Sequence, residues 1–233
     1  MRINKYLAAC GVASRRECDK IIEDGKVTVN GKKVAPGYNV CDGDEVFVNG
    51  NKVTVKKNEY YILNKPKGYI CTVSDEKGRK TVLDLMPQNV GRIYPVGRLD
   101  YDSEGLLILT TDGELAQHLT NPKNDVPKTY LVKIEGTATE ATLNPIRSGI
   151  EIDGGYVTKK CKAHIVETNK EYTKIHVTLT EGKNREIRKM FAAIGREVTL
   201  LKRIKIGELS LRGLDRGAYR KLSQKEVEYL MSI

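Results

Sequence analysis

The sequence predicts an α+β fold, in which a small N-terminal module precedes a larger domain built on a mixed, mainly antiparallel sheet. Three observations support this prediction. The 233 residues are 39% hydrophobic and 30% charged, which suits packed cores in one or two domains. Two helical patterns and an Asn-Gly hairpin signal come before residue 48. From residue 60 onward, strand patterns recur with few helices between them, which disfavours a doubly wound parallel sheet.

The first 48 residues form a module of their own in this prediction. INKYLAAC predicts a short helix, and SRRE begins a second one that ends at Gly25. Ser14 and Glu17 match a capping box, in which each side chain binds the other residue's backbone amide. Asn30-Gly31 lies between two short strands and predicts a hairpin, because both residues tolerate positive φ. A chain of this length buries little apolar surface, so the module is expected to be marginally stable alone.

Residues 49–59 are polar and lack a clear period, so they are predicted to be a linker to the domain of residues 60–233. In that domain YYILN, LLILTT and KTYLVKIEG predict strands, and CKAHIVE with YTKIHVTL predicts a hairpin. TVLDLM, ELAQHLT and TEATLNPIRSG predict short helices, the last with a break near Pro145. SQKEVEYL, capped by Ser223 with Glu226, predicts a structural C-terminal helix.

GKNREIRKMFAAIG is the clearest helical pattern in the chain. Its apolar residues form one stripe at helical spacing, which we interpret as core: Ile187, Met190, Phe191 and Ile194. Arg185, Arg188 and Lys189 stand off this stripe near the helix start, where the helix dipole disfavours cations. Basic side chains at this unfavourable position suggest that these side chains face an anion.

The formal net charge of +10 is concentrated in two parts of the chain. Residues 183–221 hold 12 Lys and Arg against four acids, and residues 1–33 hold eight bases against four acids. Such clustering favours a polyanionic partner, because each neutralised phosphate releases counterions. A solvated charged surface is the alternative, but it would require two separate patches to be accidental.

Several features point to the cytoplasm. No apolar stretch is long enough to cross a membrane, and the N-terminus does not match a secretory signal. The five cysteines are odd in number and contain no CxxC pair, so neither a zinc ribbon nor a disulfide framework is indicated. We expect a reducing compartment and no membrane partner.

Most common catalytic motifs are missing. The chain has no P-loop, no GxGxxG after a strand, no HExxH, no GxSxG and no cluster of its three histidines. What remains is GRLDYDSEG, residues 97–105, immediately before an apolar strand. Asp100 and Asp102 could bind a divalent metal, but two carboxylates make a weak site. Alternatively Asp102 caps the turn and Asp100 acts as nucleophile or base, kept ionised by Arg185 or Arg188. From the residues alone, a plain turn residue explains Asp100 equally well.

The same segment carries a family resemblance. GRLDYDSEGLLILTTDGEL, with KPKG upstream and EGKNREIRKMF downstream, strongly resembles the pseudouridine synthases of the RsuA family. KTYLV matches that family's tyrosine motif. Residues 3–34 resemble the RNA-binding domain first described in ribosomal protein S-four. The resemblance covers nearly the whole chain and is nearest to the RluB-like enzymes of large-subunit rRNA.

The resemblance implies isomerisation of a uridine in RNA, in which uracil is detached from ribose, rotated and rejoined through carbon. No cofactor, metal or nucleotide is implied. Asp100 matches the family's essential aspartate, and attack on the uracil ring or on the ribose carbon both stay open. Tyr130 matches the tyrosine that stacks on the target base. Arg188 matches the base that pairs with the aspartate.

The resemblance also implies RNA contacts. Arg98 matches a residue that fills the space left by a flipped base, where a guanidinium can stack and donate hydrogen bonds. Leu99 and Ile187 are expected to line the uracil pocket, although a core position would explain both equally. The other predicted RNA contacts are Lys65, Lys67, Lys183, Arg185, Arg2, Lys5, Arg15 and Arg16. For Lys65 and Lys67 the alternative is a solvated turn.

Two features set this chain apart from related patterns. Gly97 precedes Arg98, where the other large branch of these synthases has His, and this favours the RsuA-type branch. The chain also lacks the long basic tail of some RluB-like and RluF-like relatives, so any affinity from such a tail must come from elsewhere.

Other functions stay open at this point. The RNA is expected to be large-subunit rRNA or an assembly intermediate, with small-subunit rRNA or tRNA as alternatives, because basic patches contact backbone and shape. A ribosome-associated module that lost the chemistry would not need Asp100, Tyr130 and Arg188 together. A metal-dependent nuclease would need more carboxylates than Asp100 and Asp102. We expect a monomer.

Overall fold

The computed structural model describes all 233 residues and divides them into two compact units. The smaller unit comprises Met1–Glu59, Asn89–Ile93 and Thr111–Gly113. The larger unit comprises Tyr60–Gln88, Tyr94–Thr110 and Glu114–Ile233. No helix is long and apolar enough to span a lipid bilayer.

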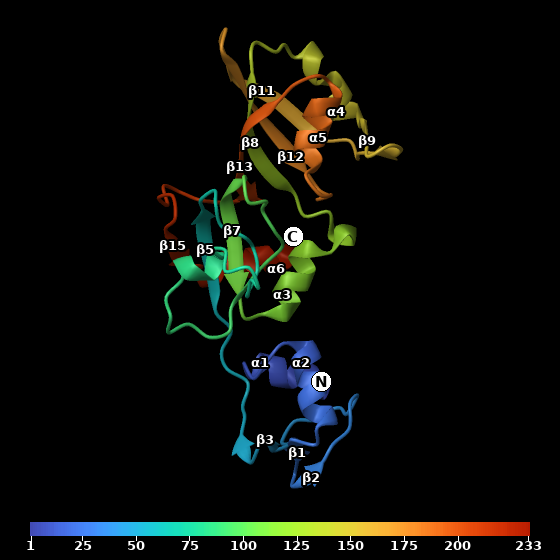
Figure 1. Cartoon of the computed structure of the whole chain (residues 1–233), viewed down its shortest axis with the longest axis vertical. Helices are drawn as coiled ribbons and strands as arrows, with labels where there is room; N and C mark the ends of the chain where they lie inside the picture. Colours follow the sequence, from blue (N-terminus) through green and yellow to red (C-terminus); the bar gives the residue numbers. More distant parts are fainter. The chain divides into compact units, whose positions relative to one another are not determined.

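The smaller unit packs two short helices beside a four-stranded sheet (Figure 1). The helices are α1 (Ile3–Ala9) and α2 (Arg15–Glu23). The sheet has the order β2-β1-β3-β4, with β1 (Val27–Val29), β2 (Lys32–Lys33), β3 (Val46–Val48) and β4 (Asn51–Lys52). Its core includes Ile3, Leu7 and Ile22, all at most 2% exposed.

Two local predictions for this unit are confirmed. The Ser14 hydroxyl accepts the Glu17 amide at 3.2 Å, and the Glu17 carboxylate accepts the Ser14 amide at 2.8 Å. Asn30 and Gly31 have φ of 50° and 78°, the left-handed pair that a two-residue hairpin turn requires. One expectation differs: the segment predicted to be a linker begins with β4, because Asn51 and Lys52 pair with Val48 and Phe47.

The larger unit is built on a nine-stranded sheet whose main order is β11-β12-β8-β13-β7-β5-β15. The strands along this order are β11 (Lys162–Thr168), β12 (Tyr172–Leu179), β8 (Lys128–Glu135), β13 (Val198–Ile206), β7 (Glu104–Thr110), β5 (Tyr60–Lys65) and β15 (Tyr219–Lys221). At the sides β6 (Tyr94–Pro95) pairs with β7, and β14 (Leu209–Ser210) pairs with β13. Every pair is antiparallel except β13 with β7, so the predicted mixed, mainly antiparallel sheet is confirmed.

The sheet carries a separate hydrophobic core on each half. Beside β11 and β12 lie α4 (Asn144–Ser148) and α5 (Glu186–Ala193). Beside β7 lie α3 (Gly113–Thr120) and α6 (Gln224–Ser232). The remaining short elements are η1 (Val82–Leu85), η2 (Pro122–Asn124), η3 (Ala141–Leu143), β9 (Glu151–Ile152) and β10 (Tyr156–Val157).

Strand β13 joins the two halves of this sheet. It pairs with β8 on one side and with β7 on the other. The two backbones approach closely at Gly105, which has φ of 108° and faces Arg203. A Cβ at Gly105 would collide with the Arg203 carbonyl oxygen, so only glycine fits there. The parallel pairing sets the end of the GRLDYDSEG segment against β13.

The helix predictions are confirmed in their main features. On α5 the stripe residues Ile187, Met190 and Phe191 are at most 4% exposed. Ser223 and Glu226 form the expected capping box of α6. Pro145 lies in the first turn of α4, directly after η3, at the predicted break. The strands that the sequence analysis did not identify include β13 itself.

Candidate active site

A cavity of about 330 Å³ opens between the two halves of the sheet in the larger unit. The loop of residues 96–103 forms one wall, and the segment of residues 179–187 forms the opposite one. Side chains of β8 and β13 lie between them. The volume is at the small end of ligand pockets, which suits a group the size of one nucleobase with part of its sugar.

The loop that carries Asp100 is fixed from below by Lys65. Lys65 is 0% exposed, and its Nζ donates to the carbonyls of Pro66 at 3.1 Å, Asp100 at 3.0 Å and Ser103 at 2.8 Å. Burial lowers the pKa of Lys65. The prediction that Lys65 contacts RNA is therefore wrong, because all three donors are turned inward. Lys67, two residues later, is exposed and can reach a ligand.

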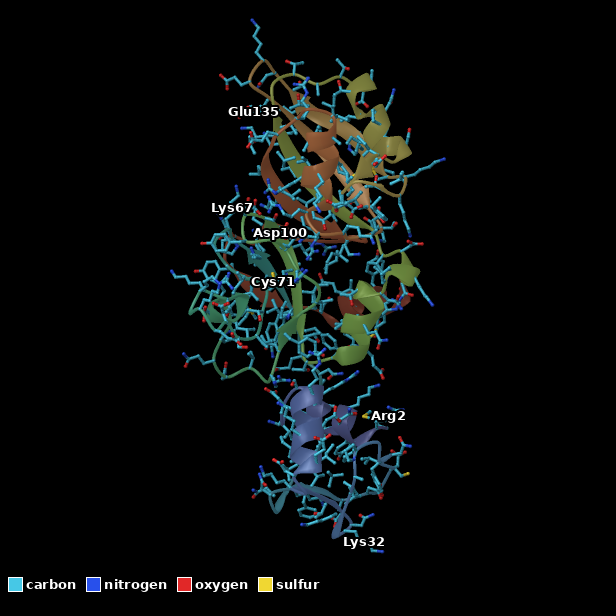
Figure 2. All side chains as sticks on the ribbon, turned by 45° about the vertical axis from the view of Figure 1, so that its right-hand side comes forward. Arg2, Lys32, Lys67, Cys71, Asp100 and Glu135 are labelled. Carbon is cyan, nitrogen blue, oxygen red and sulfur yellow. The ribbon has the colours of Figure 1, made fainter.

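Cys71 fixes the same loop one residue before Asp100. Its Sγ lies 3.3 Å from both the backbone nitrogen and the carbonyl oxygen of Leu99. Burial raises the pKa of the Cys71 thiol, which keeps it a neutral hydrogen-bonding group. Figure 2 shows Asp100, Cys71 and Lys67 in one part of the larger unit, whereas Glu135 lies at the far end of β8.

Asp100 is partly exposed, with 33% of its side chain accessible, and it lines the cavity. Its Oδ2 lies 3.9 Å from Nη1 of Arg185. The Asp100 carbonyl accepts the Ser103 amide at 3.0 Å and closes the turn. The backbone of Asp100 therefore serves the turn while its carboxylate faces the cavity, so the turn and functional explanations are compatible.

Asp102 is held by two arginines. Arg185 donates two hydrogen bonds to its carboxylate, at 3.1 and 3.2 Å. Arg188 Nη2 lies 3.2 Å from the Asp102 carboxylate and also donates to the Asp102 carbonyl at 3.2 Å. Burial alone would raise the pKa of Asp102, but these two guanidinium groups offset it and the pKa is lowered. Asp102 is thus an ionised structural partner rather than a simple turn cap.

The expected pairing of Arg188 with Asp100 is not what the structure contains. Arg188 pairs with Asp102 and donates to the Val198 carbonyl at 2.8 Å, so it fixes α5 to the loop and to β13. Arg185 is the arginine nearest to the Asp100 carboxylate. Sequence spacing could not separate these two bases, because Arg185 is the non-helical residue that precedes α5, with φ of 52°. This left-handed conformation aims its side chain away from the helix.

The other predicted pocket residues lie where they were expected. Tyr130 is half-buried on β8 and lines the cavity. Leu99 and Ile187 also line it, and at 6% and 4% exposure they are core residues as well. Arg98 and Lys183 are exposed at its rim, and the Lys183 ammonium lies 4.5 Å from the centre of the Tyr156 ring.

The predicted basic residues of the smaller unit are surface residues. Arg2, Arg15 and Arg16 are exposed, and Lys5 is half-buried on α1. Arg15 and Arg16 occupy the first turn of α2, where the Glu17 carboxylate already accepts one of the backbone amides. Figure 2 shows Arg2 and Lys32 on this unit.

Two acids in the cavity wall were not identified from the sequence. Glu181 and Glu186 are 9% and 4% exposed. Burial, followed by the hydrogen bond with Glu181, raises the pKa of Glu186. Burial would also raise the pKa of Glu181, but hydrogen bonds from Glu186, Tyr156 and the Lys159 amide lower it. Glu186 is therefore the protonated member, and its Oε2 accepts the Lys183 amide at 2.8 Å at the start of α5.

Two bases, Lys128 and Arg203, also line the cavity and were not identified as site residues. Lys128 lies two positions before Tyr130 on the same strand, so strand alternation could have placed both on one face. Arg203 lies in the unidentified strand β13, opposite Tyr130. The described residues contain no cluster of three or more His, Cys, Asp or Glu side chains that could hold a metal.

Comparisons with known proteins agree with this arrangement. A family model described as RNA pseudouridylate synthase matches residues 59–193, and an S4 domain matches residues 1–46. Ribosomal large subunit pseudouridine synthase B of Bacillus subtilis (strain 168) is 43% identical over 234 residues, covering 100% of this chain and 96% of that relative. Dual-specificity RNA pseudouridine synthase RluF of Salmonella typhi is 39% identical, covering 97% of this chain and 77% of that relative.

A solved structure is also similar. A crystal structure of a pseudouridylate synthase matches with a TM-score of 0.71 and 31% sequence identity, covering 99% of both chains. The family model spans more than half of the chain, and the identity to a full-length relative exceeds two residues in five. The chain therefore belongs to the RNA pseudouridylate synthase family.

Proposed function

We propose that this enzyme converts a uridine of large-subunit rRNA to pseudouridine, with Asp100 as its nucleophile. The observation that carries the proposal is the placement of Asp100, whose carboxylate lies in the cavity with Arg185 3.9 Å away. A carboxylate next to a guanidinium is stable in its ionised, nucleophilic form. The 43% identity to an enzyme named for the large subunit supports that choice of RNA.

The rest of the cavity supplies what a flipped base needs. Tyr130 offers an aromatic face on which uracil can stack, with Leu99 and Ile187 as apolar neighbours. Arg98, exposed at the rim, is free to enter the space that the base leaves in the RNA. Arg188 acts as a positioning residue, because it holds Asp102 and thereby the loop that presents Asp100.

The basic surface supplies affinity without sequence reading. Lys67 and Lys183 are exposed near the cavity, and Arg2, Arg15 and Arg16 are exposed on the smaller unit. Such side chains neutralise phosphates and position the RNA. We also propose a monomer that acts in the cytoplasm without a cofactor.

Pseudouridine mapping on a large-subunit rRNA transcript tests the proposal. The transcript is treated with the wild-type enzyme or with Asp100→Asn, and modified positions are read along the whole RNA. A site made only by the wild type is expected. Modification of small-subunit rRNA or tRNA alone would overturn the choice of RNA, and equal modification by Asp100→Asn would overturn the role of Asp100.

A further inference from the structure

The inner end of the cavity holds an arginine with an unused donor. Arg203 is 3% exposed, and its Nε donates to the Leu106 carbonyl at 2.7 Å. Its Nη2 is buried and has no hydrogen-bond partner in the protein, and Arg203 is one of the residues that line the cavity. A buried guanidinium nitrogen without an acceptor is costly, so a hydrogen bond from Arg203 to an acceptor on a ligand in the cavity would be favourable.

Lys128 supplies a second cation next to Arg203. Ile206 and Arg203 of β13 lie opposite Lys128 and Tyr130 of β8, so Lys128 and Tyr130 project from the same face. The Lys128 Nζ donates to the Val126 carbonyl at 3.0 Å, which uses one of its three donors. Lys128 and Arg203 form no ion pair with any residue of the chain.

The charges around Lys128 come from three elements. Arg203 faces it from β13, Glu186 faces it from α5, and Asp125 lies in the loop before β8. Burial, followed by the charge of Arg203, lowers the pKa of Lys128 to about 8. Two cations so close to each other, without a carboxylate bound to either, require an external anion or a strong acceptor.

A uracil held by Tyr130 and Leu99 offers such acceptors, because its two carbonyl oxygens project from the ring edge. We propose that Lys128 and Arg203 bind a carbonyl oxygen of the flipped uracil and stabilise the negative charge that the ring carries during isomerisation. This inference rests on the proposed function and adds two residues to it. We call the side-chain nitrogens of Lys128 and Arg203 at the inner end of the cavity the cationic floor.

The chemistry of the isomerisation requires such a floor. When the bond between ribose C1′ and uracil N1 breaks, its electron pair stays on the ring and is shared with the carbonyl oxygens. Addition of a carboxylate to the ring also places negative charge on a carbonyl oxygen. The ring then forms the C5–C1′ bond, C5 loses its proton and N1 gains one, so product and substrate have the same composition. Either route therefore gains from cations that are already in place.

The dependence of kcat/KM on pH provides the first test. Lys128 must be protonated to act, so kcat/KM on large-subunit rRNA transcript is expected to fall above about pH 8 in the wild type. Lys128→Arg keeps its charge at higher pH and should lose this alkaline decrease. Lys128→Met should lower the single-turnover rate at pH 7 by about 10²-fold with RNA affinity within twofold, as expected for a lost oxyanion donor.

A matched control lies on the same strand. Lys133 on β8 stacks over the Tyr172 ring at 4.1 Å, away from the cavity, so Lys133→Met removes the same charge there. It should keep the wild-type rate and the alkaline decrease. A Lys128→Met rate equal to that of Lys133→Met, with an unchanged pH profile, would overturn the cationic floor. Lys128 is tested rather than Arg203 because Arg203 also holds β7.

A binding measurement separates this inference from the choice of RNA. NMR of protein labelled with ¹³C at lysine Cε, leucine methyl groups and tyrosine rings follows the Lys128, Leu99 and Tyr130 signals with uridine 5′-monophosphate as probe. An upward shift of the Lys128 titration midpoint is expected and would support the floor even if large-subunit rRNA were not modified. Uridine 5′-monophosphate that shifts the Leu99 or Tyr130 signals but not that of Lys128 would overturn it.

Discussion

The basic residues of the two units are arranged in opposite ways. In the smaller unit Arg15 and Arg16 are exposed in the first turn of α2 and form no ion pair. In the larger unit Arg185 and Arg188 are bound to one carboxylate, and Arg203 is bound to a backbone carbonyl. The basic side chains that we propose as RNA contacts are left in water, whereas those that shape the cavity are held by the protein. The amino-acid composition does not separate these two groups, because it counts exposed and protein-bound Lys and Arg residues alike.

The same contrast occurs within one turn of the larger unit. Lys65 and Lys67 are separated by a single proline. Lys65 is fully buried on three carbonyls, and Lys67 is exposed. Two lysines that look equivalent as RNA contacts therefore have different tasks, and variants of each can separate stability from binding.

Asp100→Asn should have the largest effect of these variants, because it should lower the rate of the reaction and leave RNA affinity almost unchanged. The amide keeps the size of the side chain but cannot attack carbon, so single-turnover pseudouridine formation should fall about 10³-fold or more. RNA affinity should stay within twofold, because the exposed bases are untouched. Filter binding and single-turnover kinetics on the same RNA check this, and a loss of both together would contradict it.

Lys65→Met should be the most destabilising of the lysine variants. It leaves three buried carbonyls without their donor, at a cost of about 3 kcal/mol in the free energy of unfolding. Lys67→Met is the matched control and should change stability by less than about 0.5 kcal/mol while weakening RNA binding. Urea unfolding and RNA titration of both variants measure the difference. Equal stability of the two would show that Lys65 does not hold the loop.

Removal of Arg15 and Arg16 together should weaken RNA binding and leave the site intact. Two lost phosphate contacts should reduce affinity about tenfold and lower the salt slope by about 1 to 2. The single-turnover rate at saturating enzyme should not change. Binding titrations from low to moderate salt test this, and a salt slope equal to that of the wild type would remove these arginines from the interface.

Glu186→Gln should have the smallest effect of these variants, a change in the free energy of unfolding that is seen at high pH. The raised pKa means that folding favours the protonated carboxyl, so its contribution is complete below the unfolded pKa and is lost as pH rises through the folded one. Gln keeps the hydrogen-bonding groups and has no proton to lose. The variant should match the wild type at pH 5 and exceed its unfolding free energy by about 1 kcal/mol at pH 9. Melting curves at both pH values would show a constant difference if Glu186 were ionised throughout.

The fold was predictable where one short segment decides the structure. The capping boxes of Ser14 and Ser223 and the Asn30-Gly31 turn depend on neighbours within three residues, and all are confirmed. The α5 stripe has a period that only a helix satisfies. Strand β13 was not identified, because VTLLKRIKI mixes apolar and basic residues and its pairing partners lie far away in the chain.

The candidate site was predictable in its residue types but not in its pairings. The resemblance grouped Asp100, Tyr130 and Arg188, whereas the cavity is lined by Asp100 and Tyr130 together with Arg185, and Arg188 is not among its lining residues. Motif spacing could not show that Arg188 binds Asp102. That pairing depends on how α5 begins, and the residue before α5, Arg185, has a left-handed backbone that the sequence does not reveal. The burial of Lys65 likewise depends on the loop that folds over it.

Strand β13 also sets the order in which the enzyme can be completed during synthesis. The sheet halves meet only through this strand, and Arg203 pairs with Gly105 almost a hundred residues earlier. Both β7 and β8 must wait for Ile206 to leave the ribosome before their shared edge is filled. The four-stranded sheet of the smaller unit, by contrast, is complete once Lys52 has emerged. The growing chain therefore acquires α1, α2 and their sheet long before it acquires the cavity around Asp100.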